Sequence, residues 1–417
     1  MTKIGRPLDI AIAGCGPAGL AAALFLTRAG HRITLFDQFD EPRPLGSGLI
    51  LQPTGLAVLA ELGLDAQILS LGQRIDRLYG RVAKTQRIVL DVRYATLGAD
   101  IFGLAVHRSA LFSVLYEAVR REGITIETGQ KISGVDQVAD SRVRLIGEDG
   151  CSCGPFDLAI DALGVRSTLT HIFDPTRRPR SDLAYGALWA SIPWSGQGFD
   201  GHSLEQRYER ASTMIGVLPI GRIQHGGQQL AALFWSIKPS DYQRWQSEGL
   251  DAWKDKVLKL WPQTAPLLDF IQQTEDLTLA RYCHSTLANT VAPRMVAIGD
   301  AAHAASPQLG QGANMALLDA RALALALEEA QDVQSGLAAY ARARRPHVRF
   351  YQALSFGFTP AYQSDSRILP ILRDWVIAPA TRLPGIRKFV AASVAGVVLD
   401  PRIHLRLLYQ PREAVSA

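Results

Sequence analysis

A glycine-rich turn stands near the start of the chain, between a short apolar run and an alanine-rich one. Gly14-Cys15-Gly16-Pro17-Ala18-Gly19 matches the pattern G-x-G-x-x-G. Asp9–Ala13 predicts a strand before the turn, Ala18–Ala29 a helix after it, and His31–Phe36 a second strand. This order is that of a βαβ unit, so we expect an α/β fold built around a parallel sheet.

The glycines of this turn leave space that a dinucleotide needs. Gly14 permits the tight turn, Gly16 lets the backbone approach a pyrophosphate, and Gly19 lets helix and strand pack closely. The helix N-terminus stabilises phosphate charge, and Asp37 ends the second strand where a carboxylate can accept hydrogen bonds from an adenosine ribose. The predicted dinucleotide-binding residues are Gly14, Gly16, Pro17, Ala18, Gly19 and Asp37. The motif does not distinguish FAD from NAD, and a turn without a ligand is the alternative.

Later parts of the chain alternate between strand and helix patterns. Period-two alternation over Arg77–Leu97 predicts a hairpin, and residues 182–237 hold aromatic and aliphatic runs bounded by Pro and Gly that predict a mostly antiparallel sheet. The other main expected elements are helices at Val106–Glu122, Leu250–Thr274, 312–330 and 334–357 and strands at Ile124–Glu127, Arg142–Ile146, Leu158–Asp161 and Met295–Ile298.

Length and composition exclude several classes of protein. The chain has 417 residues, more than the roughly 100–200 of one domain, so two connected domains are expected. Lys and Arg number 44 against 39 Asp and Glu, without a basic run interleaved with aromatics, so we expect no nucleic-acid partner. The apolar run Phe389–Leu399 is shorter than the ~20 residues of a spanning helix, and Cys151-Ser-Cys153 lacks zinc-site spacing. We therefore expect no membrane insertion, no metal and, from the sparse cysteines, a cytoplasmic location.

A second glycine-rich segment follows the expected strand at Met295–Ile298. It contains Gly299-Asp300, then Pro307, Gly310-Gln311-Gly312-Ala313-Asn314 and Asp319. The strand would deliver Asp300 at its carboxyl end, where a carboxylate can hold the ribityl hydroxyls of FAD. Gly310 and Gly312 leave no side chains where the backbone must approach an isoalloxazine ring, and the helix that begins there points its positive end at the flavin.

This second segment closely resembles the GD-and-GQG segment of the class A flavoprotein monooxygenases, the para-hydroxybenzoate hydroxylase and salicylate hydroxylase family. The similarity extends to Gly46–Leu64, to Arg108 at a helix start and to Tyr340–Arg349. The resemblance implies FAD as the cofactor, NAD(P)H as a transient reductant and O2 as a co-substrate. It implies an enzyme that hydroxylates an aromatic or other ring-containing small molecule through a flavin C4a-hydroperoxide.

The expected fold is α/β, with a Rossmann-like FAD-binding domain of the glutathione-reductase type, an inserted and mostly antiparallel β-sheet substrate domain, and a helical C-terminus. The expected boundaries are 1–75, 98–180 and 281–357 for the FAD-binding domain, 76–97 and 181–280 for the substrate domain, and 358–417 for the C-terminal helical segment. Beyond the first motif, the expected cofactor-binding residues are Arg108, Gly299, Asp300, Gly310, Gly312, Ala313 and Asn314.

The pocket above the flavin is expected to be apolar and closed, because water destroys the reactive flavin species. The candidate pocket residues are Leu49, Leu51, Trp189, Met214, Phe234 and Pro307. The resemblance places Pro307 near the reacting face, while ordinary sheet core is the alternative for the aromatic and aliphatic residues. The chemistry is expected to centre on the flavin; Tyr208, His202 and His225 are candidate bases, but none stands in a diagnostic motif.

One segment departs from the family pattern. The family usually carries Asp-Gly followed by Arg-Ser before the substrate domain, whereas this chain has Asp161-Ala162-Leu163-Gly164-Val165-Arg166-Ser167. Aligned on Gly164, the expected Asp is Leu163, and Asp161 lies two residues earlier. In the family this motif is linked to NAD(P)H use, so the departure leaves the choice of reductant open.

Three other functions remain as alternatives. The Asp-Ala-Leu-Gly variant favours a flavin-dependent reductase or dehydrogenase of an isoprenoid or polyketide. A flavin halogenase shares the framework, but its Trp-x-Trp-x-Ile-Pro pattern is matched only at Ile192-Pro193. A non-catalytic flavoprotein or membrane-docked partner is suggested by the largely apolar Ile368–Leu399, which can equally form a helical lid or the face of a homodimer.

Overall fold

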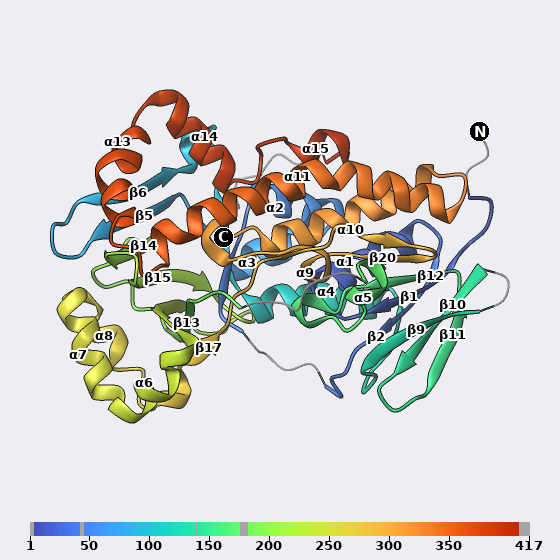
Figure 1. Ribbon diagram of the computed structural model, residues 1–417, viewed down its shortest axis with the longest axis horizontal. Helices are drawn as coiled ribbons and strands as arrows, with labels where there is room; N and C mark the ends of the chain where they lie inside the picture. Colours follow the sequence, from blue (N-terminus) through green and yellow to red (C-terminus); the bar gives the residue numbers. More distant parts are fainter. Residues whose placement is uncertain (1–3, 42–45, 139–140, 176–181, 408–417) are drawn as a thin grey trace.

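A 30-residue helix, α11 (Val333–Tyr362), extends along the long axis of the molecule in the computed structural model (Figure 1). The structure describes residues 4–41, 46–138, 141–175 and 182–407. The N-terminal βαβ unit lies towards one end of this helix and a large antiparallel sheet towards the other. The predicted mixed α/β fold is confirmed.

Six strands form a sheet in the order β19-β20-β12-β1-β2-β8. Every neighbouring pair is parallel except β19 and β20. The strands are β1 (Asp9–Ala13), β2 (Arg32–Phe36), β8 (Thr125–Glu127), β12 (Leu158–Asp161), β19 (Val291–Ala292) and β20 (Met295–Ala297). Their parallel direction places the ends of β1, β12 and β20 at one edge, which is where ligands bind in open α/β sheets.

The predicted βαβ unit is confirmed. Helix α1 (Pro17–Arg28) follows β1 through the glycine turn and leads into β2, which pairs with β1 from Asp9↔Arg32 to Ala13↔Phe36. Around it pack α2 (Pro53–Glu61), α3 (Asp65–Leu71), α4 (Arg108–Arg121) and α10 (Gly312–Glu329). The nine residues Ala18–Leu26 of α1 are all buried, so the apolar helix forms the centre of the core.

A smaller sheet in the order β11-β10-β9 packs beside the parallel one. Its strands are β9 (Ile132–Val138), β10 (Arg142–Gly147) and β11 (Ser152–Phe156). Strand β10 agrees with the predicted strand at Arg142–Ile146, whereas β9 and β11 carry no clean alternation and were not predicted.

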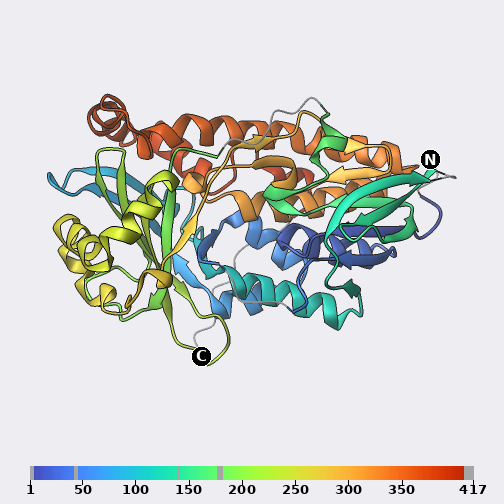
Figure 2. The ribbon, with the colours of Figure 1, turned by 60° about the horizontal axis from the view of Figure 1, so that its bottom comes forward.

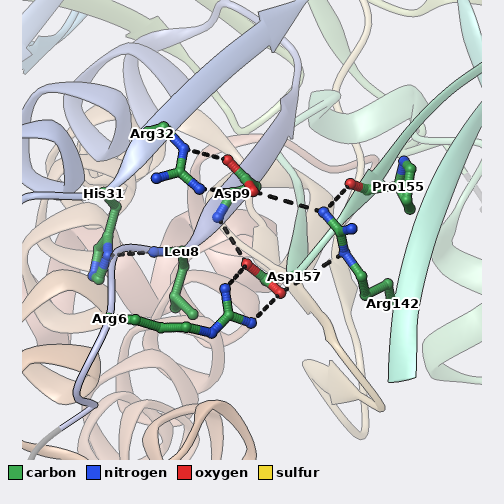
Figure 3. A network of polar contacts seen from close by, with 8 residues as sticks. All are labelled: Arg6, Leu8, Asp9, His31, Arg32, Arg142, Pro155 and Asp157. Carbon is green, nitrogen blue, oxygen red and sulfur yellow. Dashed lines mark hydrogen bonds and ion pairs between the residues drawn. The ribbon is translucent and has the colours of Figure 1, made fainter. Parts of the chain in front are cut away.

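A buried carboxylate joins this small sheet to the parallel one (Figure 3). Asp157 accepts two hydrogen bonds from Arg6, at 3.1 and 2.7 Å, and one from the backbone N–H of Asp9 at 2.9 Å. Arg142 of β10 lies 3.6 Å from Asp9 and 3.9 Å from Asp157. Burial acts to raise the pKa of Asp157, but the hydrogen bonds from Arg6 and Asp9 and the charges of Arg6 and Arg142 outweigh it and lower that pKa. The network therefore holds the N-terminal segment, β1 and β10 together while the carboxylates are ionised.

Seven strands form the second large sheet, in the order β17-β13-β16-β15-β14-β5-β6. They are β5 (Arg77–Val82), β6 (Ile88–Arg93), β13 (Gly186–Pro193), β14 (Ser203–Glu209), β15 (Thr213–Gly221), β16 (Leu230–Ile237) and β17 (Thr278–Ala280). The predicted hairpin at Arg77–Leu97 is confirmed as the antiparallel pair β5/β6, which joins the later strands through the one parallel pair, β14/β5.

Each face of this sheet has a different neighbour. Leu188, Ile215 and Leu233 face a core that α6 (Tyr242–Glu248), α7 (Leu250–Leu260) and α8 (Ala265–Leu268) close with Trp245, Trp253 and Trp261. Figure 2 shows these helices, in yellow, outside the strands. The residues that alternate with them, such as Trp189, Met214 and Phe234, face a cavity instead.

Several predicted elements have different bounds. The single helix expected over Leu250–Thr274 is wrong: α7 ends at Leu260, because Pro262 begins a 3-10 turn that precedes α8. Gly48–Leu51 forms β3 and Gly103–His107 forms β7 ahead of α4, and neither strand was predicted. With β4 (Gln73–Ile75), these strands make a third small sheet, ordered β3-β7-β4.

The chain beyond α11 is helical, with α12 (Leu369–Leu372), α13 (Ala378–Ala380), α14 (Pro384–Val394) and α15 (Pro401–His404). The remaining short elements are α5 (Thr170–Phe173), α9 (Asp300–His303) and β18 (Ser285–Thr286). Ile368 and Trp375 are 75% and 64% exposed, so the apolar stretch does not bury all of its large side chains. Among the helices that the structure describes, none combines the length and the apolar character needed to cross a membrane.

Candidate functional site

A cavity of about 860 Å³ is lined by residues of both large sheets. At one end its wall holds Gly14, Gly16 and Asp37 of the βαβ unit, and at the other Trp189, Met214 and Phe234 of the seven-stranded sheet. The segment from Ser306 to Ala313 lies in the same wall. Both glycine-rich motifs and the aromatic strands thus surround one continuous space.

The glycine turn has the shape that a pyrophosphate needs. Gly14 has φ +108°, and a Cβ there would lie 2.3 Å from the Ala162 carbonyl oxygen. A Cβ on Gly19 would lie 1.9 Å from the Gly14 oxygen, so both glycines are required by close packing within the protein. A Cβ on Gly16 would meet no atom within 4 Å, so the space beside this residue at the start of α1 is open. These residues fit a bound dinucleotide, with phosphate at the helix N-terminus.

Asp37 holds this turn from the end of β2. Its Oδ2 atom accepts a hydrogen bond from the backbone N–H of Cys15 at 2.6 Å, and the Gly14 N–H donates to the Phe36 carbonyl oxygen at 2.7 Å. Asp37 lines the cavity together with Gln38, Gln130 and Lys131, none of which we predicted. This polar group lies where the second strand ends, as an adenosine ribose requires.

Asp300 faces the cavity from the start of α9. Gly299 precedes it with φ +61°, and its backbone N–H donates to Asp319 Oδ2 at 2.8 Å. Surrounding protein raises the pKa of Asp300, although the charges of His303 and Arg108 oppose that rise, and its side chain is solvent-accessible through the cavity. The carboxylate is thus an open hydrogen-bond acceptor at the end of β20, which suits a ribityl chain.

A buried ion group supports this turn. Asp319 is 0% exposed; His303 Nε2 lies 2.5 Å from its Oδ2, and Arg344 Nε donates to its Oδ1 at 2.7 Å. Burial acts to raise the pKa of Asp319, but the charges and hydrogen bonds of His303 and Arg344 hold it well below the usual range. His303 is therefore a structural partner of Asp319. Arg344, which the sequence placed only within the segment Tyr340–Arg349, acts together with His303 to keep this carboxylate ionised.

Asn314 connects the second motif to β3. Its Oδ1 accepts the Gln52 N–H at 2.7 Å, and its Nδ2 donates to the carbonyl oxygens of Ile50 and Gly310 at 3.1 and 2.9 Å. Gly310 adopts the left-handed conformation with φ +61° at the end of a 3-10 turn (Pro307–Leu309). Asn314 is fully buried and does not line the cavity, so it shapes the cavity wall rather than facing a ligand.

Arg108 is the first residue of α4 and lies in the cavity wall. The side chain of His107 caps this helix by accepting from the Ser109 N–H at 3.2 Å. Gly46, with φ +123°, passes so close that a Cβ there would lie 2.8 Å from Arg108 Cδ. The start of α4 and the close approach of Gly46 thus fix the position of the Arg108 guanidinium. Its positive charge lies in the same cavity wall as the carboxylates of Asp37 and Asp300.

The segment that departs from the family pattern follows β12. Asp161 is 0% exposed and does not line the cavity; its carboxylate accepts from the Leu163 N–H at 3.1 Å and from the Ser167 hydroxyl at 2.6 Å. Leu163, Gly164 and Arg166 do line it. Asp161 therefore holds the turn, and Leu163 presents an apolar side chain where a carboxylate was expected.

The far wall is aromatic with a few uncharged polar groups. The rings of Trp189 and Phe234 lie 4.7 Å apart between centroids, and a Cβ on Gly216 would lie 2.0 Å from the Phe234 ring. Trp189 Nε1 donates to the Tyr282 hydroxyl at 2.8 Å. The Tyr208 hydroxyl donates to Gln206 Oε1 at 2.7 Å, and burial raises the pKa of Tyr208 well above its ordinary value.

Most predicted site residues lie in the cavity wall, but some do not. Those in the wall are Gly14, Gly16, Pro17, Ala18, Asp37, Leu49, Arg108, Trp189, Met214, Phe234, Asp300, Pro307, Gly310, Gly312 and Ala313. Those outside it are Gly19, Leu51, Gly299 and Asn314. Leu51 is 0% exposed and packs in the core of the first domain. Of the candidate bases, Tyr208 lines the cavity, whereas His202 and His225 are exposed and do not.

Sequence reasoning missed Gln206, Tyr282, Tyr362 and Gln363 in the far wall. Gln206 could have been found, because it alternates with Leu204 and Tyr208 on one face of β14. Tyr362 and Gln363 come from the end of α11, and no local pattern indicates that this end reaches the cavity.

The fold and the cavity together are those of a dinucleotide-dependent enzyme, with an aromatic wall at the other end of the same cavity. The chain belongs to the FAD binding domain family, whose model matches residues 7–353 of its 417 residues. The predicted cofactor FAD and the predicted class, an FAD-dependent monooxygenase, are confirmed.

Similar proteins match nearly the whole chain. Salicylate hydroxylase of Pseudomonas putida is 28% identical over 422 aligned residues, which cover 92% of this chain and 90% of the relative. 3-Hydroxybenzoate 6-hydroxylase 1 of Aquipseudomonas alcaligenes is 28% identical over 355 residues, covering 81% and 84%. A crystal structure of a variant of 2-methyl-3-hydroxypyridine-5-carboxylic acid oxygenase shares the fold, with a TM-score of 0.78 and 22% identity over 97% of this chain and 99% of that one.

Proposed function

We propose that this enzyme hydroxylates an aromatic or other ring-containing small molecule that lies against the wall of Trp189, Met214 and Phe234. One observation carries the proposal: the same cavity reaches from the dinucleotide-binding turn to an aromatic sheet face. The hydroxylated or pyridine rings in the names of the relatives support a ring substrate.

The residues that would hold FAD come from both motifs. Gly16, with open space beside it, and the N-terminus of α1 would take the pyrophosphate, and Asp37 the adenosine ribose. Asp300 would accept hydrogen bonds from the ribityl hydroxyls, while Gly310, Gly312 and Ala313 would pass beside the ring, with Arg108 near. When bound, FAD accepts electrons from NAD(P)H and activates oxygen.

The protein itself would position the ring substrate and exclude water from the reacting face of the flavin. The seven-stranded sheet presents the ring-binding wall, and its opposite face packs on α6–α8. We assign residues 76–97 and 181–280 to this substrate domain, 1–75, 98–180 and 281–357 to the FAD-binding domain, and 358–417 to the C-terminal segment. Pro307 would lie between the two parts of the cavity. An apolar wall keeps water from the reacting face.

Tyr208 would act as a hydrogen-bond donor to the substrate or to Gln206, and not as a base. Because burial raises the pKa of Tyr208, its hydroxyl stays protonated through the physiological range. Its hydrogen already reaches Gln206 Oε1, so a base role would require loss of that bond. NAD(P)H would visit the site only transiently, because the described residues hold one glycine-rich βαβ turn rather than two.

The test is oxygenation of a ring. The holoenzyme would be supplied with NADPH or NADH, isotopically labelled oxygen and a panel of hydroxylated aromatic and heteroaromatic compounds. We expect a product heavier by one labelled oxygen atom, in proportion to the NAD(P)H consumed. Reduction of a substrate double bond without oxygen uptake would favour the reductase alternative and contradict the proposal.

A further inference from the structure

We propose that the ring substrate is an uncharged molecule, recognised through amide, carbonyl or hydroxyl groups and not through a carboxylate. This inference rests on the proposed function and narrows its substrate class. It is argued from the distribution of charge around the cavity.

All charged side chains in the described cavity wall belong to the FAD end. They are Asp37, Arg108, Lys131, Arg166 and Asp300, and none comes from the seven-stranded sheet. The FAD end is the end that must hold phosphates and ribose hydroxyls. The far wall instead contains Trp189, Met214 and Phe234 with the uncharged polar side chains of Gln206, Tyr208 and Tyr282.

The strand pattern explains why no charge reaches the far wall. Along β14, Leu204, Gln206 and Tyr208 line the cavity, whereas Glu205 and Arg207 alternate with them and so point to the other face. There, Arg207 lies 3.8 Å from Glu205 and its guanidinium stacks 4.3 Å from the Trp261 ring centroid. Glu205 and Arg207 therefore pair with each other on the side of α6–α8.

A second buried cation, Arg373, lies behind the wall and is paired with an acidic residue. Arg373 is 0% exposed and stacks on the rings of Tyr208 and Tyr362, at 4.9 and 5.4 Å from their centroids. Its Nε donates to Asp374 Oδ1 at 2.7 Å, and its Nη1 donates to the carbonyl oxygens of Arg210 and Ala361. The Arg373 Nη2 atom is buried without a hydrogen-bond partner among the described residues, but the guanidinium is paired with Asp374 and does not line the cavity.

Two polar side chains of the far wall have hydrogen-bond donors that a neutral substrate could use. Gln206 Nε2 donates to Met214 Sδ at 3.4 Å, which leaves a second N–H. The Tyr282 hydroxyl accepts from Trp189, and its own hydrogen has no acceptor among the described residues. An N–H and an O–H can hold a carbonyl or hydroxyl oxygen of a ring substrate. A buried carboxylate, in contrast, needs a cation or several donors to offset its desolvation.

The test compares each carboxylate with its amide on the wild-type holoenzyme near neutral pH. The probe pairs are benzoate and benzamide, salicylate and salicylamide, and hydroxynaphthoate and hydroxynaphthamide. Dissociation constants come from the change in absorbance of the bound flavin, and thermal shifts of the same samples give a second readout that needs no turnover. We expect each amide to bind at least about tenfold more tightly than its carboxylate. Equal or tighter binding of the carboxylates, or no binding of any amide, would overturn the inference.

A positive charge placed in the wall should shift the preference towards the carboxylates. Leu204→Arg is expected to favour the carboxylates by about tenfold relative to wild type, whereas the matched neutral variant Leu204→Gln should leave the preference unchanged. If Leu204→Arg does not fold, Met214→Lys with Met214→Gln makes the same comparison. An unchanged preference in a folded, flavin-containing cationic variant would contradict the inference. If the neutral probes bind but no ring is oxygenated, the proposed function is wrong, whereas the inference about the charge of the ligand still holds.

Discussion

The Oδ2 atom of Asp319 accepts a hydrogen bond from the backbone N–H of Gly299 at 2.8 Å, so helix α10 fixes the turn from which Asp300 faces the cavity. The same oxygen lies 2.5 Å from His303 Nε2, and the other oxygen accepts from Arg344. One buried carboxylate thus joins β20, α9, α10 and α11 at the place where FAD would bind.

We expect Asp319→Asn to lower both stability and flavin retention. The amide would leave the Arg344 guanidinium buried without an opposite charge, which costs about 3–5 kcal/mol of unfolding free energy. Urea denaturation and the flavin content after gel filtration measure the two effects. Asp251→Asn, an exposed change on α7, serves as the control. Wild-type flavin retention in a destabilised Asp319→Asn would show that the carboxylate does not support the cofactor site.

Substitutions of two glycines in the first motif should affect different properties, FAD binding in one case and stability in the other. Because a Cβ at Gly16 meets no protein atom within 4 Å, Gly16→Val should leave the stability of the FAD-free protein near wild type while abolishing most FAD binding. Gly14→Ala should lower stability itself, because its Cβ would lie 2.3 Å from the Ala162 oxygen. Apoprotein melting temperatures and FAD titrations separate the two, with Gly201→Val as a control in open space. Normal FAD binding by Gly16→Val would refute the assignment of the pyrophosphate site.

The network around Asp157 predicts a pH dependence of stability. The folded-state pKa of Asp157 is lowered, so the unfolded chain binds the proton more readily, near its usual value of about 3.9. The contribution of the Asp157 carboxylate to the free energy of unfolding is therefore complete above that pH. It is lost as the pH falls through the lower pKa of the folded state.

Asp157→Asn should accordingly lower the unfolding free energy by about 1–3 kcal/mol at neutral pH and by less in acid. Urea denaturation of the wild type and the variant from neutral to acid pH measures this difference in unfolding free energy. The exposed Asp255→Asn is the control. If the difference in unfolding free energy stays constant as the pH is lowered, the ionisation of Asp157 does not cause the loss of stability.

Gly216 controls the position of a wall residue. A Cβ on Gly216 would lie 2.0 Å from the Phe234 ring, so Gly216→Ala should push that ring and cost about 1–3 kcal/mol of stability. Because Phe234 lines the cavity, affinity for the neutral ring probes should fall while FAD is retained. Gly357→Ala, in open space on α11, is the matched control. Unaltered probe binding would place the ring substrate away from Phe234.

The sequence predicted the elements whose patterns are local. The strand Asp9–Ala13, the hairpin at β5/β6 and the strand Leu158–Asp161 follow from periodicity and turn residues alone. The glycine motif likewise placed Gly14, Gly16 and Asp37 together, because strand, turn and helix are contiguous there.

The parts that could not be predicted depend on long-range packing. Tyr362 and Gln363 reach the cavity only because α11 continues for 30 residues through two internal prolines. Leu51, expected in the pocket, is buried in the core of the first domain, although Leu49 on the same strand lines the cavity; no local signal in the sequence indicates that the cavity ends before Leu51. The sequence shows Leu163 where the family pattern has Asp, but it does not show that Asp161 holds this turn by accepting from Leu163 and Ser167.

The most direct test of the account is an anaerobic absorbance titration of the purified holoenzyme with NADH and then NADPH, with salicylamide absent and present. The account predicts that a bound flavin is bleached by at least one of the two nucleotides and recovers when oxygen is admitted. A protein that holds no flavin, or a flavin that stays oxidised under all of these conditions, would contradict an FAD-dependent monooxygenase that takes its electrons from NAD(P)H.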